Sequence, residues 1–182
     1  MTLRAKSEHP QVKGLRRDAG HSAMALLIYG KSVCALCGRV INQNELTCSF
    51  PPFVVNELDA CFVFSDGAFH EACVRKHMHG IDALRRVDEW ASRVGPGKRK
   101  CIVCEMEVAD PDDYLLIDHL SDREEDPLRE FNYTHLHRSY VQKWNSRSRF
   151  VDLAAAALAS DSWKGPYLIR LIEEIGAKSL HQ

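Results

Sequence analysis

The chain has 182 residues and a formal net charge of −1, with hydrophobic and charged fractions of 45% and 27% that are ordinary for a globular protein. The near-neutral charge argues against a nucleic-acid partner, and no apolar run is long enough to cross a membrane. The cysteine count is seven, an odd number, and two Cys-x-x-Cys pairs stand out. This pattern favours metal-bound thiolates in a reducing compartment over disulfides, so we expect a cytoplasmic protein.

The first unit is expected over residues 22–94, after a polar, basic leader at residues 1–21 that we expect to be flexible. Two thiols three residues apart, Cys34 and Cys37, form a tight turn (a knuckle) that presents both sulfurs to one ion. Hairpin strands are predicted at residues 46–53 and 61–64 because both segments are apolar and end at turn residues. The unit therefore begins with half of a metal site.

The other half comes from a helix predicted to run from near Phe69 to about His79. His70 and Cys73 would share one face of its first turn, close to the positive end of the helix dipole, which favours a thiolate. Cys34, Cys37, His70 and Cys73 are a full set of tetrahedral Zn²⁺ ligands. Four protein ligands leave no position for a substrate, so we expect a structural zinc ion.

A second, amphipathic helix is expected at residues 81–94, and Gly95-Pro96-Gly97 then marks a linker. The next unit, residues 95–148, repeats the first: a shift of 67 positions carries Cys34 to Cys101 and aligns further residues. The aligned candidate ligands are Cys101, Cys104 and His137. A strand at residues 114–118 and a helix from His137 through Trp144 are expected, and we interpret the unit as a duplicated zinc module.

The fourth ligand of the second site is open, because Tyr140 stands where Cys73 stands in the first and a neutral phenol is a poor zinc ligand. His135 is the first candidate, since residues i and i+2 of an extended segment point the same way. His119, Asp118 or a water molecule are others. The remaining alternative is a metal-free repeat that packs around Tyr140 and Trp144.

The C-terminal segment, residues 149–182, predicts two short amphipathic helices packed on the repeats. Cys48 and Cys61 lie in apolar segments outside both motifs, and we interpret them as buried small hydrophobes. The expected fold class is α+β: two tandem treble-clef zinc modules, each with a knuckle, a β-hairpin and a helix, followed by C-terminal helices.

The segment Phe69-His70-Glu-Ala-Cys73-Val74 resembles the Phe-His-x-x-Cys-hydrophobic segment of RING-H2 domains, and both knuckles are similar to the Cys-x-hydrophobic-Cys opening of RINGs. The ligands of a second interleaved RING zinc should fall near Ser65 and Gly67, which cannot ligate. The chain therefore resembles a single-zinc RING-like module present twice, similar to divergent RING-like E3 components of bacterial ubiquitin-like conjugation systems.

This resemblance implies a protein that docks an E2-like conjugating enzyme and promotes transfer of a ubiquitin-like modifier without a covalent intermediate. It implies no catalytic residue. By position, the docking contacts would be Leu36, Val103 and Trp144, and packing in the core is the alternative for each of them.

Two other functions compete with this one. Asp118-His119, Asn132 and His137 follow the order of an HNH-like metal-dependent nuclease, in which a histidine activates water and another holds a cation. The gap from Asn132 to His137 is short for that family. A non-catalytic zinc adaptor for protein–protein interaction, as in LIM domains, is the third possibility.

Overall fold

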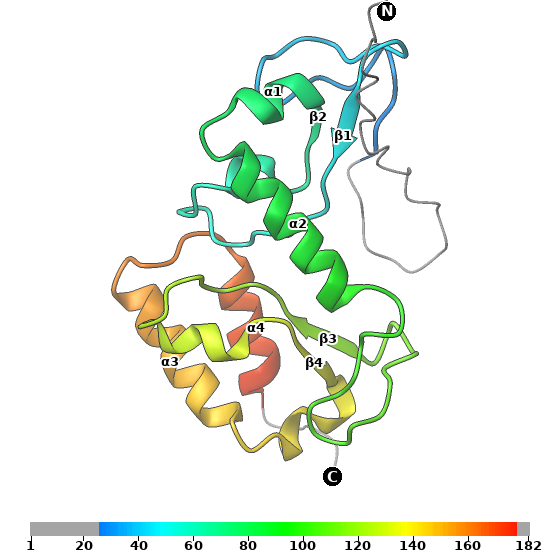
Figure 1. Ribbon diagram of the computed structural model, residues 1–182. Helices are drawn as coiled ribbons and strands as arrows, with labels where there is room; N and C mark the ends of the chain where they lie inside the picture. The colour runs from blue at the N-terminus through cyan, green and yellow to red at the C-terminus, as the bar shows by residue number, and fades with distance from the viewer. Residues whose placement is uncertain (1–25, 178–182) are drawn as a thin grey trace, which may run out of the picture.

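The computed structural model describes residues 26–177, so the expected leader at residues 1–21 lies outside the described residues. The described chain is α+β, with four α-helices and two separate two-stranded antiparallel sheets (Figure 1). Among these residues, no helix has both the length and the apolar character needed to span a bilayer.

The first unit opens with the knuckle, which is closed by an isolated bridge between Val33 and Val40. The elements that follow are β1 (Thr47–Ser49), the 3-10 helix η1 (Phe62–Phe64), β2 (Ala68–His70), α1 (Glu71–Lys76) and α2 (Gly80–Val94). Strands β1 and β2 pair antiparallel with Cys48 opposite Phe69. The predicted strand at residues 61–64 is wrong: that segment contains η1, and the true partner of β1 is β2.

The second unit has the same order of elements. They are β3 (Tyr114–Ile117), the 3-10 helix η2 (Pro127–Phe131), β4 (Thr134–His137), the 3-10 helix η3 (Arg138–Lys143) and α3 (Arg147–Ala159). Helix α4 (Tyr167–Gly176) follows and packs against α3. The strand and both C-terminal helices expected here are present, but a 3-10 helix replaces the α-helix expected after His137.

The duplication extends to the backbone geometry. In β1–β2 Thr47 lies opposite His70, and in β3–β4 their counterparts 67 residues later, Tyr114 and His137, lie opposite each other. Left-handed backbone torsions also recur in matched pairs: Gly30 and Gly97, Gly38 and Glu105, Asp66 and Tyr133. A glutamate and a tyrosine adopt this costly conformation only where the surrounding fold imposes it, so the two units share one backbone design.

Helix α3 is the counterpart of α2, although the two helices share no residue at matched positions. Equivalent first-turn hydrogen bonds begin them, from Ala83 N to His79 O and from Phe150 N to Ser146 O. The second unit therefore continues through α3, beyond the boundary at residue 148 that the sequence suggests.

Each unit has its own hydrophobic core. In the first it comprises Cys34, Ile41, Phe50, Phe53, Val54, Cys61, Phe64, Phe69, Val74 and Ala83. In the second it is larger because α4 contributes Leu168, Leu171 and Ile175. Cys48 and Cys61 occupy the positions of Leu115 and Leu128 in the second unit, which both lie in the core. The two cysteines therefore act as small apolar side chains that pack in or against the first core. Burial raises the pKa of Cys48 to about 11, so this thiol stays protonated.

Polar contacts join the units. Helix α2 runs from the first unit toward the second (Figure 1), and its Arg86 forms ion pairs with Asp59 of the first unit and Asp122 of the second. Trp90 donates a hydrogen bond from Nε1 to Asp118 (3.4 Å). The segment between α3 and α4 completes the junction, because Asn56 donates to the carbonyl of Ser162.

Candidate metal centres

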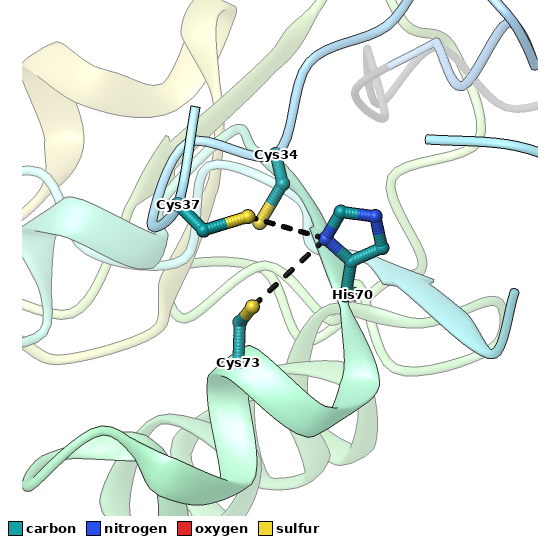
Figure 2. Close-up of side chains that lie close together, drawn as sticks. All are labelled: Cys34, Cys37, His70 and Cys73. Atoms are coloured by element: carbon teal, nitrogen blue, oxygen red, sulfur yellow. Dashed lines mark hydrogen bonds between the residues drawn. The ribbon is translucent and has the colours of Figure 1, made fainter. Parts of the chain in front are cut away.

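The first candidate site lies between the knuckle and the start of α1. Cys34 and Cys37 come from the knuckle, His70 ends β2, and Cys73 lies in the first turn of α1 (Figure 2). One ligand atom from each of the four residues lies within 4.8 Å of all the others. His70 Nδ1 is 3.4 Å from Cys37 Sγ and 3.9 Å from Cys73 Sγ. These spacings are close to those of donors around one ion, because a tetrahedral ion with bonds of 2.0–2.3 Å separates its ligands by roughly 3.3–3.8 Å.

A carboxylate fixes the orientation of the His70 ring. Nε2 of His70 lies 3.2 Å from Glu45 Oε2, and the backbone N–H of Asn42 donates to the same oxygen (2.7 Å). The His70 residue is only 4% exposed. When a carboxylate accepts a hydrogen bond from Nε2–H, Nδ1 carries a free lone pair and can bind a metal ion. This is the usual arrangement around a metal-bound histidine.

The electrostatics of the thiols also fit a cation. Burial opposes ionisation of Cys34, but backbone N–H groups, including that of His70, lower its pKa overall. The backbone N–H of Arg39 and then its guanidinium lower the pKa of Cys37 to about 6. Burial, followed by the neighbouring cysteines, raises the pKa of Cys73 to about 11. Without a metal, ionisation of one thiol disfavours ionisation of its neighbours because the thiolates repel one another. A bound divalent cation would offset this repulsion and allow all three to ionise.

The second candidate site has three donors, from Cys101, Cys104 and His137, again within 4.8 Å of one another. The backbone N–H of His137 donates to Cys101 Sγ (3.4 Å). Nδ1 of His137 lies 2.9 Å from Asp113 Oδ2, and Asp113 also accepts hydrogen bonds from the backbone N–H and hydroxyl of Ser139. Asp113 thus holds His137 much as Glu45 holds His70, although through the other ring nitrogen.

His135 is not part of this group of three. Its Nδ1 forms a hydrogen bond with the hydroxyl of Tyr114 (2.8 Å), its Nε2 lies 3.1 Å from the carbonyl oxygen of Arg93, and the ring stacks on Tyr114. Both ring nitrogens are therefore occupied, and the expectation that His135 is the fourth ligand is wrong. Tyr140 lies beside His137, with ring centroids 5.7 Å apart, as the alignment with Cys73 predicts.

The residues of the nuclease alternative have structural roles. Nε2 of His119 forms a hydrogen bond with Asp122 (2.9 Å). The Asn132 amide accepts from the backbone N–H groups of Leu120 and Ser121 and donates to the Ser121 carbonyl. Among the described residues, neither Cys/His group includes His119. Asn132 is thus occupied in holding a loop, and of the nuclease residues only His137 belongs to a Cys/His group.

The three expected docking contacts are largely covered. Trp144 is 7% exposed and belongs to the second core, so it is not a surface contact. Leu36 and Val103 are half-buried and pack against the first and second cores respectively. The carboxylates Glu45 and Asp113 are the site residues that sequence reasoning missed; the only signal for them is an acidic residue just before β1 and β3.

The two knuckles differ in what they expose. Around the first lie five exposed apolar residues, which we call the apolar knuckle face: Ile28, Tyr29, Val33, Val40 and Leu46. Their counterparts 67 residues later are Gly95, Pro96, Lys100, Glu107 and Asp113. The second knuckle exposes other apolar side chains, Ile102 and Met106, so the two units share a backbone but present different surfaces.

The fold and its sites define an α+β chain with two Cys/His groups that could hold metal ions, one with four donors and one with three. Comparison with protein-family models, curated proteins and solved structures finds no match for this chain. Its function must therefore be inferred from its own residues.

Proposed function

We propose that this protein is a zinc-dependent, RING-like scaffold that binds an E2-like conjugating enzyme and promotes transfer of a ubiquitin-like modifier. In this proposal the zinc ion of the first site is structural, and the chain provides no nucleophile. The observation that carries it is a Cys3His group with four donors in the first unit, whose knuckle is flanked by exposed apolar side chains.

Zinc is the metal that best suits the donors. Thiolate sulfur with imidazole nitrogen is the usual ligand set of structural Zn²⁺, whereas Mg²⁺ and Ca²⁺ prefer oxygen. Such a site contributes on the order of 10 kcal/mol of apparent binding free energy to the folding of a small module. Each unit here has a small core, so this contribution suits it.

The order of elements supports two treble clefs. In both units a knuckle is followed by an antiparallel hairpin and then by a helical turn that starts at the ligating histidine, His70 or His137. The knuckle and the start of the helix provide the ligands in each, as in the RING-like modules that the sequence resembles.

The apolar knuckle face is the proposed docking surface, in place of Leu36, Val103 and Trp144. Val33 and Val40 are 50% and 43% exposed and lie opposite each other in the bridge that closes the knuckle. Tyr29 reaches β1 through its hydroxyl, which is 3.5 Å from Thr47 Oγ1. Exposed apolar side chains gathered around one turn in this way are typical of a protein-binding site.

The test exchanges this surface for that of the second unit. Val33→Lys with Val40→Glu installs the pair found at Lys100 and Glu107, which forms the same isolated bridge, so the knuckle should still fold. The matched control is Lys100→Glu with Glu107→Lys, which changes the second knuckle without adding apolar surface.

The assay measures discharge of a modifier thioester from candidate E2-like enzymes, with zinc content and E2 binding measured on the same samples. The wild-type chain and the control should bind and accelerate discharge, and the exchanged variant should do neither while keeping its metal. Binding without acceleration would favour the adaptor instead. Equal activity of the exchanged variant would refute the docking surface.

A further inference from the structure

The second metal site has fewer protein donors than the first. The first group has four ligating side chains, and the second has three, with Tyr140 at the position of Cys73. Within residues 26–177, no further Cys, His, Asp or Glu lies within 4.8 Å of all three donors, because His135 is bound elsewhere and Asp113 falls outside the group. A metal ion in this group would therefore keep a coordination position that those side chains do not fill.

We propose that the second site is an open metal site that binds an exogenous thiolate, supplied by a small-molecule thiol, as its fourth ligand. This inference rests on the proposed zinc binding and goes beyond it, because a structural ion has no such position.

The chemistry of the donors favours sulfur. Two cysteine thiolates neutralise a divalent cation and make the site soft, so a third thiolate suits it better than a carboxylate does. The first unit shows the complete arrangement, since Cys73 provides a third sulfur from the same backbone position. An external thiolate would thus give the second site the donor set of the first.

The surroundings allow an anionic ligand to approach. The His137 side chain is 16% exposed, compared with 6% for His70. Tyr140 is half-buried beside it, and Lys143 places its ammonium 4.7 Å from the centre of the Tyr140 ring. The ammonium of Lys143 therefore lies near Tyr140, the residue that stands at the position of Cys73, and its positive charge favours the approach of an anion on that side.

Binding is a ligand exchange without redox chemistry. The S–H bond of the thiol breaks, its proton goes to solvent, and a metal–sulfur bond forms as the previous occupant of the position leaves. No oxidant or reductant is required.

The test uses the full chain loaded with Co²⁺, whose sulfur-to-metal charge-transfer absorption scales with the number of metal–sulfur bonds. Addition of 2-mercaptoethanol should raise the bonds per chain from five to six, and the absorption by about 1.2-fold. The control Tyr140→Cys provides an internal third sulfur, so it should start at the higher absorption and not respond. X-ray absorption of the zinc-loaded wild-type chain gives a second count of sulfur ligands.

Each outcome decides the inference. No change with thiol in the wild-type chain, or an equal change in Tyr140→Cys, would overturn it. His9, His21 and His181 lie outside the described residues, and a response seen only after all three become alanine would show that the chain itself fills the position. A metal content below two ions per chain would instead refute the proposed pair of zinc sites.

Discussion

Replacing Asp118 with asparagine should stabilise the protein at alkaline pH. Asp118 is 7% exposed, its Oδ1 accepts the backbone N–H of His119 (2.9 Å), and its Oδ2 accepts a long hydrogen bond from Trp90 (3.4 Å). Burial raises the pKa of Asp118 from 3.8 to about 7, because these hydrogen bonds only partly replace the lost hydration. The carboxylate is therefore costly to ionise in the folded protein.

The sign follows from proton linkage. Between about pH 4 and about pH 7 the folded state holds a proton that the unfolded state has released, so stability falls as the pH rises through this window. The full cost above the folded pKa is about 4 kcal/mol, for a shift of about three pH units. Of this, about 2–3 kcal/mol should develop between about pH 5 and about pH 8.

The measurement is urea unfolding of wild-type and Asp118→Asn proteins at both pH values with excess zinc. The difference in unfolding free energy should shift by about 2–3 kcal/mol in favour of the variant as the pH rises. Metal-linked protonation affects both proteins and cancels. Asp152→Asn, on the exposed side of α3, is the matched control. An unchanged difference between the two pH values would refute a buried, protonated Asp118.

Three further predictions test other parts of the structure. Cys34→Ser should lower the metal content by about one ion per chain and unfold the first unit, as metal analysis with circular dichroism will show. Retention of both ions would contradict the site. Arg86→Met should cost about 2 kcal/mol in urea unfolding, because Asp59 and Asp122 lose their shared cation; the cost is moderate since the Asp122 side chain is 39% exposed. Gly80→Ala should lower the free energy of unfolding by about 2–4 kcal/mol, because its Cβ would collide with the Val74 carbonyl. The control Gly176→Ala places its Cβ in open space and should be near neutral in thermal unfolding. Equal effects of the two substitutions would contradict the close approach of α1 and α2.

The ligands of the first site could be predicted from sequence because metal geometry restricts them to short, fixed spacings. Two residues in a knuckle and two in a helical turn leave little freedom. The structure confirms that Cys34, Cys37, His70 and Cys73 come together. The identity of the metal and of any partner remains a prediction.

The hairpin partner could not be found in this way. Residues 61–64 are apolar and β-prone, yet Phe64 lies at the end of a 3-10 helix and β2 spans three residues only. Such short strands leave almost no alternation in the sequence, and their position is set by tertiary packing.

The fourth ligand of the second site was mispredicted for a different reason. The i, i+2 rule places His135 and His137 on one face of β4, but it says nothing of what else lies on that face. The His135 ring instead forms hydrogen bonds with the Tyr114 hydroxyl and with the carbonyl of Arg93 near the end of α2. These partners are distant in sequence, so only the folded chain reveals them.

Separate cores give each half a measure of independence. The buried residues of the two halves form distinct clusters, and apart from Val55, which packs against the second core, the contacts between the halves described above are charged or polar side chains on α2 and the loops. Chelator damage in one half can therefore leave the packing of the other intact. In a chain with an ion in both Cys/His groups, loss of one ion would then leave one half folded, and the other half could refold around a single incoming ion.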